Sequence, residues 1–336
     1  MSIKNDRRLL VLGCGAWGTA LAIVLRAAGH EVNVWGHEPD YSLEIEKTRR
    51  NPKFLPDVEI PDSIRFSGDI ESLVDGVSTI YSVVPTQFLR GTLEQVGSAL
   101  NGGSLFVSCS KGFEAKTQKR PSEIIEEQFP NARVAVLSGP SHAEEVCRYL
   151  PATLVAASAS PEAARDVQQL MGSKSFRLYT SGDPIGVEVG GATKNVIAIA
   201  CGISDGLGFG INARAGLMTR GLREMTRLGC DLGAQADTFA GLSGMGDLVA
   251  TCCSSLSRNW TVGSRVGKGE LLDDILASTE QVAEGVNTTK SLADLATRTG
   301  TDLPITRQVY EVLFRKKPAR EAVESLMTRE SKQEAL

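Results

Sequence analysis

Residues that commonly bind metals are scarce in this chain and do not form pairs. Among 336 residues there are only three histidines, His30, His37 and His142. The seven cysteines include no C-x-x-C pair, the spacing typical of zinc sites and thiol redox motifs. An odd number of thiols without such spacing is typical of a reducing compartment. We therefore expect no metal, no disulfide framework and a cytoplasmic location.

Positive charge is not in excess either. The chain has 36 lysines and arginines against 40 aspartates and glutamates, a formal net charge of −4. A nucleic-acid groove normally carries an excess of positive charge, so we expect no nucleic-acid partner. A few well-placed cations can still hold a small phosphate inside an acidic protein. The composition is therefore compatible with a small anionic substrate.

Apolar runs of membrane length are also lacking. The run Val196–Ile203 is too short to span a bilayer. Near the N-terminus, basic residues precede the apolar stretch Leu9–Leu25, an order that resembles a signal peptide. Glycines interrupt this stretch and a second strand pattern follows it directly, which favours a buried strand and helix. We expect no stable membrane insertion.

Short apolar, β-branched runs alternate with amphipathic stretches in the first half of the chain. This alternation is typical of βαβ units on a parallel sheet buried on both faces. The segment Asn51–Gly68, with three prolines, is expected to be an irregular insertion. The expected strands are Leu9–Gly13, Glu31–Trp35, Thr79–Val84, Leu105–Ser110, Val134–Ser138 and Thr153–Ala157. The expected helices include Ala16–Ala28, Tyr41–Arg49, Gln87–Ala99 and Ser122–Gln128.

The second half of the chain has a different pattern. After about residue 183, strand patterns vanish and long stretches with a period of about 3.6 residues follow. These stretches include Gly186–Ile203, Ala213–Leu228 and Leu303–Phe314. A chain of this length usually forms two domains. We predict an α/β fold, with a doubly wound parallel sheet in residues 1–183 and an all-helical substrate and catalytic domain in residues 184–330.

Residues 13–18 read GCGAWG, a G-x-G-x-x-G motif between the first expected strand and helix. In dinucleotide-binding proteins the first glycine permits a tight turn, the second lets the backbone approach a pyrophosphate, and the third lets helix and strand pack closely. The helix N-terminus also presents unpaired N–H groups to the phosphates. Because of its strand–turn–helix context, the motif predicts a dinucleotide site at Gly13, Gly15 and Gly18.

The residues after the second expected strand bear on the choice of cofactor. An NAD enzyme usually has Asp or Glu there to hold the ribose hydroxyls. This chain has Gly36-His37-Glu38 instead. His37 could donate to a 2′-phosphate, Glu38 could serve NAD, or His37 could be a loop side chain in solvent. The pattern favours NADPH over NADH.

A lysine within an apolar helix is the first catalytic candidate. Lys194 lies in GGATKN, followed directly by Val196 and Ile197. Removing an ammonium group from water lowers its pKa toward the range in which it can act as a general base. The alternative is a lysine whose stem is buried while its amine reaches solvent at a domain boundary. Composition alone does not decide between the two.

Two further stretches are candidates for the substrate site. Asp247 follows a glycine-rich turn and precedes an apolar run, where it could also be a simple helix N-cap. Ser257-Arg258-Asn259 combine a hydroxyl, a guanidinium and an amide, which would suit a phosphate at a helix N-terminus. Such a tripeptide is also common in capped surface turns.

Seven stretches occur in a fixed order along the chain: GCGAWGTALA from residue 13, SKGFE from 110, SGPSHAEEV from 138, GGATKNVIAIACGISDGLGFGINARAGLMTRG from 190, GLSGMGDLVATC from 241, SRNWTVG from 257 and QVAEGV from 281. Taken together, they resemble the bacterial NAD(P)-dependent glycerol-3-phosphate dehydrogenase family over essentially the full length of the chain. The resemblance implies a Rossmann-type domain, a helical domain, and reversible reduction of dihydroxyacetone phosphate to sn-glycerol 3-phosphate, which feeds glycerophospholipid synthesis.

The same resemblance implies roles for single residues. Lys194 would be the proton donor and acceptor, with Asn195 and Asp247 beside it. The implied substrate contacts are Lys111, Gly139, Ser141, Lys194, Asp247, Ser257, Arg258 and Asn259. The implied cofactor contacts are Gly13, Gly15, Ala16, Trp17, Gly18, His37, Lys111, Ala143, Arg258, Val282 and Glu284. At position 16 the family often has serine, so alanine loses a hydroxyl contact but keeps the backbone donor.

Other functions remain open at this point. A related β-hydroxyacid-type dehydrogenase, acting for example on 6-phosphogluconate, would use the same fold. A cofactor-binding redox sensor would leave the lysine and the acid idle. A cysteine-dependent dehydrogenase could use Cys252 or Cys253, although small cysteines more often pack inside helices. The oligomeric state stays open as well, although many dehydrogenases of this kind pair as homodimers.

Overall fold

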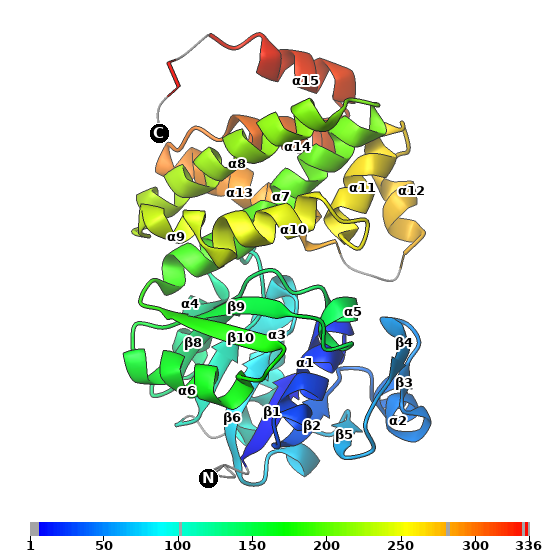
Figure 1. Cartoon of the computed structure of the whole chain (residues 1–336), viewed down its shortest axis with the longest axis vertical. Helices are drawn as coiled ribbons and strands as arrows, with labels where there is room; N and C mark the ends of the chain where they lie inside the picture. The colour runs from blue at the N-terminus through cyan, green and yellow to red at the C-terminus, as the bar shows by residue number, and fades with distance from the viewer. Residues whose placement is uncertain (1–6, 101–102, 280–282, 331–332, 335–336) are drawn as a thin grey trace.

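The computed structural model describes residues 7–100, 103–279, 283–330 and 333–334. These residues form two parts, one built around a β-sheet and one made of helices, stacked along the long axis of the molecule (Figure 1). In the described ranges, no helix is both long and apolar enough to cross a membrane.

The described residues of the first part form a sheet of eight strands in the order β10-β9-β8-β7-β6-β1-β2-β5. Neighbouring strands are parallel except for the antiparallel pair β8 and β9, so the prediction of a mainly parallel sheet is confirmed. The strands are β1 (Arg8–Leu12), β2 (Glu31–Trp35), β5 (Ile64–Ser67), β6 (Val77–Ser82), β7 (Leu105–Ser108), β8 (Arg133–Ser138), β9 (Ala152–Ala157) and β10 (Phe176–Ser181).

Two edge regions of this sheet differ from the sequence prediction. The segment Asn51–Gly68 is not irregular, because β3 (Arg50–Asn51) pairs with β4 (Leu55–Glu59) and β5 joins the main sheet. At the opposite edge, β10 was not expected. Its residues alternate between buried and exposed over most of its length, unlike the continuously apolar central strands. Edge strands are therefore the elements that a search for apolar runs misses.

Helices cover both faces of the sheet because alternate residues of its strands point to opposite sides. Leu9 and Val11 of β1 pack in one core with α1 and α6, and Leu10 and Leu12 pack in another with α3 and α4. The sheet is therefore doubly wound, as predicted. The helices of this part are α1 (Ala16–Ala27), α2 (Pro39–Thr48), α3 (Thr86–Val96), α4 (Pro121–Gln128), α5 (Ala143–Val146) and α6 (Pro161–Met171), with short 3₁₀ turns at Glu71–Leu73 and Gly97–Ala99.

The described residues of the second part form helices joined by loops, without a strand, and the part is built around α7 (Pro184–Gly206). Every residue of α7 from Gly186 to Ser204 is buried. Figure 1 shows most of the other helices around it, with α15 farther out at the end of the molecule. The other helices are α8 (Ile211–Asp231), α9 (Ala236–Ala240), α10 (Asp247–Cys252), α11 (Arg258–Gly267), α12 (Leu272–Ala277), α13 (Glu284–Thr299), α14 (Pro304–Arg315) and α15 (Ala319–Met327), with a π-helical turn at Leu242–Gly246 before α10.

Glycines set the contact between α7 and α11. A Cβ added at Gly202 of α7 would lie 2.2 Å from the carbonyl oxygen of Trp260, and one at Gly263 of α11 would lie 2.1 Å from that of Ile199. Real Cβ atoms essentially never approach so closely, so the two backbones touch with no side chain between them. This contact fixes the start of α11 relative to the centre of α7.

Candidate active site

The G-x-G-x-x-G loop adopts the geometry that its glycines predict. Gly13 has φ of 114°, in the region that favours glycine, and its N–H donates to the carbonyl of Trp35 at 2.8 Å. A Cβ at Gly18 would lie 1.9 Å from the Gly13 carbonyl oxygen, so helix α1 packs directly on the loop. At Gly15, by contrast, no atom of the described residues lies within 4 Å of an added Cβ. The backbone is therefore open where a pyrophosphate would approach.

The start of α1 fits an anionic ligand in a second respect. Gly15 is the N-cap of α1, and it provides no side-chain cap for the backbone N–H groups of the first turn. The first turn also contains no acidic residue. Unpaired N–H groups at a helix N-terminus favour phosphate groups. These features fit the dinucleotide that the motif predicts.

A cavity of about 830 Å³ runs from this loop to the helical part. That volume lies within the range of ordinary ligand sites, about 300–1,000 Å³. The predicted residues that border it are Gly13, Gly15, Ala16, Trp17, Gly18, His37, Lys111, Ser141, Ala143, Lys194, Asn195, Ser257, Arg258, Asn259 and Glu284. Within the described residues, Gly139 and Asp247 are not part of the lining, and Val282 lies outside the described residues.

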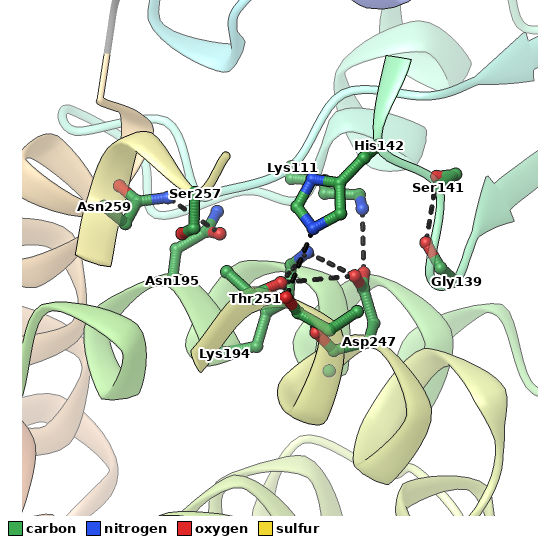
Figure 2. Close-up of polar contacts among 12 residues, drawn as sticks. Lys111, Gly139, Ser141, His142, Lys194, Asn195, Asp247, Thr251, Ser257 and Asn259 are labelled. Carbon is green, nitrogen blue, oxygen red and sulfur yellow. Dashed lines mark hydrogen bonds and ion pairs between the residues drawn. The ribbon is translucent and has the colours of Figure 1, made fainter. Parts of the chain in front are cut away.

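Two lysines and one aspartate meet at the helical end of the cavity (Figure 2). Lys194 of α7 donates through Nζ to Oδ1 of Asp247, the first residue of α10. Lys111, which follows β7, donates to the other carboxylate oxygen, Oδ2, at 2.8 Å. Lys194 also donates to Oγ1 of Thr251 at 2.8 Å, and the Thr251 hydroxyl donates to the carbonyl of Asp247 at 2.6 Å. Residues far apart in the sequence thus form one buried charge cluster.

The cluster shifts the proton affinity of each of its members. Burial lowers the pKa of Lys194 to about 8, with the nearby Lys111 ammonium adding to the shift and the Asp247 carboxylate opposing it. Burial also disfavours the charge of Lys111, but the Asp247 carboxylate outweighs it and raises the pKa of Lys111. Burial of Asp247 is outweighed in turn by the two ammonium groups, which lower its pKa. Lys194 is therefore the lysine that can exchange a proton near neutral pH.

A chain of amides lies beside the cluster. Asn259 of α11 donates through Nδ2 to Oδ1 of Asn195 at 3.0 Å and accepts from the backbone N–H of Gly285 at 2.9 Å. Ser257 caps α11 by accepting from the N–H of Trp260 at 3.2 Å. Arg258 is the first residue of that helix and borders the cavity. The tripeptide thus lies at a helix N-terminus that faces the site.

The loop after β8 approaches the cluster from the sheet side. Ser141 donates to the Gly139 carbonyl at 3.0 Å, and Gly139 has φ of 133°. His142 lies 3.2 Å through Nε2 from the carbonyl oxygen of Ala250 in α10. Because a carbonyl only accepts, Nε2 carries the hydrogen. Figure 2 shows the His142 ring pointing toward Thr251 and Asp247, so this loop contacts the helical part directly.

The far end of the cavity contains the residues that bear on the cofactor. The His37 side chain is 74% exposed and its Nε2 lies 3.6 Å from Oε1 of Glu38. Phe54, from the segment expected to be irregular, also borders the cavity. Nearer the helical part, burial raises the pKa of Glu284, while Arg258 and the two site lysines oppose this shift.

Several residues that border this cavity were not singled out from the sequence, and three of them are Thr251, His142 and Phe54. Thr251 could have been found from its position one helical turn after Asp247. His142 and Phe54 gave no signal, because their contacts depend on how the two parts of the chain meet and on a strand pairing that was not expected.

The cysteine alternative has no support in the geometry. Cys252 and Cys253 are not among the lining residues in the described part of the chain. Contact with Cys201 and burial raise the pKa of Cys252 well above its usual range. An activated thiol would have a lowered pKa. The described residues also contain no group of three or more side chains suited to a metal ion.

Comparison with known proteins identifies the family. Models of the N-terminus and the C-terminus of NAD-dependent glycerol-3-phosphate dehydrogenase match residues 8–164 and 183–324. The chain is 49% identical over 330 residues to glycerol-3-phosphate dehydrogenase (NAD(P)+) of Chlorobium phaeobacteroides, covering 97% of this chain and 99% of the relative. It is 50% identical over 329 residues to the enzyme of the same name from Geobacillus kaustophilus, covering 97% and 96%.

A solved structure gives the same result. The crystal structure of glycerol-3-phosphate dehydrogenase from Coxiella burnetii matches with a TM-score of 0.93 and 34% identity, covering 96% of this chain and 99% of that one. The family models, these relatives and the common fold agree over both parts of the molecule. The chain therefore belongs to the NAD-dependent glycerol-3-phosphate dehydrogenase family.

Proposed function

We propose that this protein catalyses the reversible, NAD(P)-dependent reduction of dihydroxyacetone phosphate to sn-glycerol 3-phosphate, and so supplies a precursor of glycerophospholipids. One observation carries the proposal: the cavity that begins at the G-x-G-x-x-G loop ends at a buried lysine whose pKa is lowered to about 8. A general acid–base group works best when its pKa lies near the operating pH. An idle lysine in a redox sensor would not need this arrangement.

The dinucleotide would be held along the cavity. The backbone N–H groups at the start of α1 would bind its pyrophosphate. His37 would donate to a 2′-phosphate, which favours NADPH over NADH. The remaining contacts would come from Ala16, Trp17, Lys111, Ala143, Arg258, Val282 and Glu284. When bound, the nicotinamide supplies or accepts the hydride.

The substrate phosphate would lie at the start of α11. The guanidinium of Arg258 and the hydroxyl of Ser257 suit an anion, and the helix N-terminus adds a favourable dipole. Asn259, Gly139, Ser141 and Lys111 would complete the substrate side of the cavity. Arg258 borders the cavity, which supports this role.

Lys194 would move the proton at the substrate C2 oxygen. In reduction its protonated amine donates to the oxygen as negative charge develops there, and in oxidation its neutral amine accepts the hydroxyl proton. Asp247 and Thr251 orient the amine through their hydrogen bonds. Asn195, held by Asn259, is available beside it for the substrate.

The test is to mix the purified protein with dihydroxyacetone phosphate and follow the loss of near-ultraviolet absorbance of NADPH, then of NADH. Rapid oxidation supports the substrate and reaction, and the ratio of the two kcat/KM values measures the cofactor preference. Folded protein that binds a cofactor without oxidising it would overturn the proposal. A hydroxy acid such as 6-phosphogluconate, assayed in the oxidative direction, would then be tried.

We also propose that the enzyme works in the cytoplasm as a homodimer. The seven cysteines without C-x-x-C spacing support a reducing compartment. The proposal of a dimer follows from related dehydrogenases, many of which pair as homodimers. Sedimentation of the purified protein would measure its mass in solution, and a monomer at micromolar concentration would contradict this part.

A further inference from the structure

A second buried carboxylate joins the two parts of the molecule away from the cavity lining. Glu188 is on α7, and its side chain is 2% exposed. Its Oε1 accepts from the backbone N–H of Ser122 at 2.8 Å. Its Oε2 accepts from the Ser122 hydroxyl and from Nη1 of Arg120, both at 2.6 Å. All of these donors belong to the sheet part of the chain.

These donors form the start of helix α4, and that position matters for the site. Arg120 is the N-cap of α4, and Ser122 lies in its first turn. The segment between β7 and α4 carries Lys111. Glu188 therefore holds α7 against the C-terminal end of this segment. Lys111, near the N-terminal end of the same segment, contacts Asp247 in the charge cluster. Hydrogen bonds to a charged group are short and strongly oriented, which suits such a contact.

The stretch of α7 between Glu188 and Lys194 also lies against the sheet part. A Cβ added at Gly191 would lie 2.8 Å from Oγ of Ser138 and 3.6 Å from Cγ of Lys111. The aliphatic stem of Lys111 thus passes close to α7 at a residue without a side chain. Successive turns of one helix contact the start of α4, the Lys111 stem and the Asp247 carboxylate.

We propose that Glu188 is a positioning residue: by holding the Arg120–Ser122 turn, it fixes the Lys111 segment on α7 so that Lys111 and Lys194 share Asp247. The inference rests on the proposed function only for its kinetic readout. Burying a charge is costly, and an apolar pair would fill the same space. An oriented ionic contact, unlike an apolar one, also fixes the position of α7 relative to the start of α4.

The position of Lys111 determines the direction in which the pKa of Lys194 shifts. The groups that act on Lys194 are Asp247 and Thr251 from α10 and Lys111 from the sheet part, with Glu284 of α13 nearby. Lys111 lowers the pKa of Lys194 and competes for Asp247. If Lys111 moves away, the pKa of Lys194 rises. If Glu188 acted on Lys194 only through long-range electrostatics, removing its negative charge would instead lower the pKa of Lys194.

The experiment compares Glu188→Gln with the wild type in the pH dependence of kcat for glycerol 3-phosphate oxidation. Glutamine keeps the size of the side chain but loses the ionic contact with Arg120. We expect the midpoint to move upward by about half a pH unit or more, since one unit corresponds to about 1.4 kcal/mol. We also expect the KM for dihydroxyacetone phosphate to rise several-fold, because Lys111 is a proposed substrate contact.

Two further variants make the result specific. Glu224→Gln is the matched control, because Glu224 is also a buried carboxylate, but it accepts from the N–H groups of Ile305 and Thr306 at the start of α14. It should leave the midpoint unchanged. Lys111→Met removes the second ammonium and should give the full upward shift. Glu188→Gln added to Lys111→Met should then cause no further rise.

A measurement that does not depend on turnover separates the positioning role of Glu188 from the proposed function. NMR titration of protein labelled at the lysine ε-carbon, with Lys194 assigned through Lys194→Arg, measures the pKa of Lys194 directly. An upward shift in Glu188→Gln supports positioning even if the substrate assignment fails. A folded Glu188→Gln protein with an unchanged or lowered pKa of Lys194 overturns the positioning role, whatever the enzyme proves to reduce.

Discussion

The two parts of this molecule build their shares of the site in different ways. The sheet part uses mainly backbone: glycines and a free helix N-terminus within residues 13–18. The helical part uses side chains from α7, α10 and α11. These side chains come from a stretch of more than sixty residues, from Lys194 to Asn259. The first kind of site depends on the space around the backbone, and the second depends on the chemistry of individual groups. Substitutions in the sheet part should therefore reduce stability or cofactor binding, whereas those in the helical part should change the reaction rate and its pH dependence.

The strongest test of this difference is Lys194→Ala. Removing the proposed proton carrier should lower kcat by about a thousandfold, within the range that general acid–base groups contribute. Cofactor binding should be unchanged, because the loop around Gly15 is untouched. Steady-state kinetics and a fluorescence titration with NADPH measure the two effects. If more than a tenth of the activity survives, Lys194 is not the proton carrier.

Asp247→Asn should have the next largest effect. The lysines would keep their mutual repulsion but lose the carboxylate that favours their charge, so the pKa of Lys194 should fall below about 8. The oxidation rate, which needs neutral Lys194, should reach its plateau at lower pH, with kcat reduced about tenfold to a hundredfold. A pH–rate profile measures both quantities. A midpoint that moves upward would contradict the proposed influence of Asp247.

A matched pair of glycine variants tests the sheet part. Gly18→Ala places a Cβ 1.9 Å from a carbonyl oxygen and should destabilise the fold by about 1–3 kcal/mol. Gly15→Ala meets no described atom within 4 Å, so its melting temperature should stay close to that of the wild type while NADPH binding weakens about tenfold. Thermal unfolding and cofactor titration separate the two outcomes. Equal losses of stability would mean that the loop geometry is different.

The smallest effect is expected at His37. Its side chain is largely exposed, so His37→Ala should raise the KM for NADPH about twofold to fivefold and leave that for NADH unchanged. Cofactor-dependent kcat/KM values measure the change. A parallel change for both cofactors would show that His37 does not discriminate between them.

The sequence predicted the sheet part better because its information is local. The fingerprint, the central strands and the doubly wound arrangement follow from periodicity and from glycines only a few residues apart. The residues alone left Lys194 undecided between catalysis and a partly solvated amine, since its partner Asp247 lies far away in sequence. The resemblance to a known family favoured catalysis. Nothing in the sequence predicted the edge strands β5 and β10 or the contact of His142 with Ala250, because these depend on tertiary pairing.

The division of the cluster between two parts has a consequence for motion. Lys194, Asp247 and Thr251 belong to the helical part, and Lys194 stands on a helix buried along most of its length. Lys111 belongs to the sheet part. A hinge movement that separates the parts would break the contact between Lys111 and Asp247 but leave the other three residues together. The readiness of Lys194 to give up its proton would then depend on whether the cleft is closed, so that closure itself would prepare the amine for the reaction.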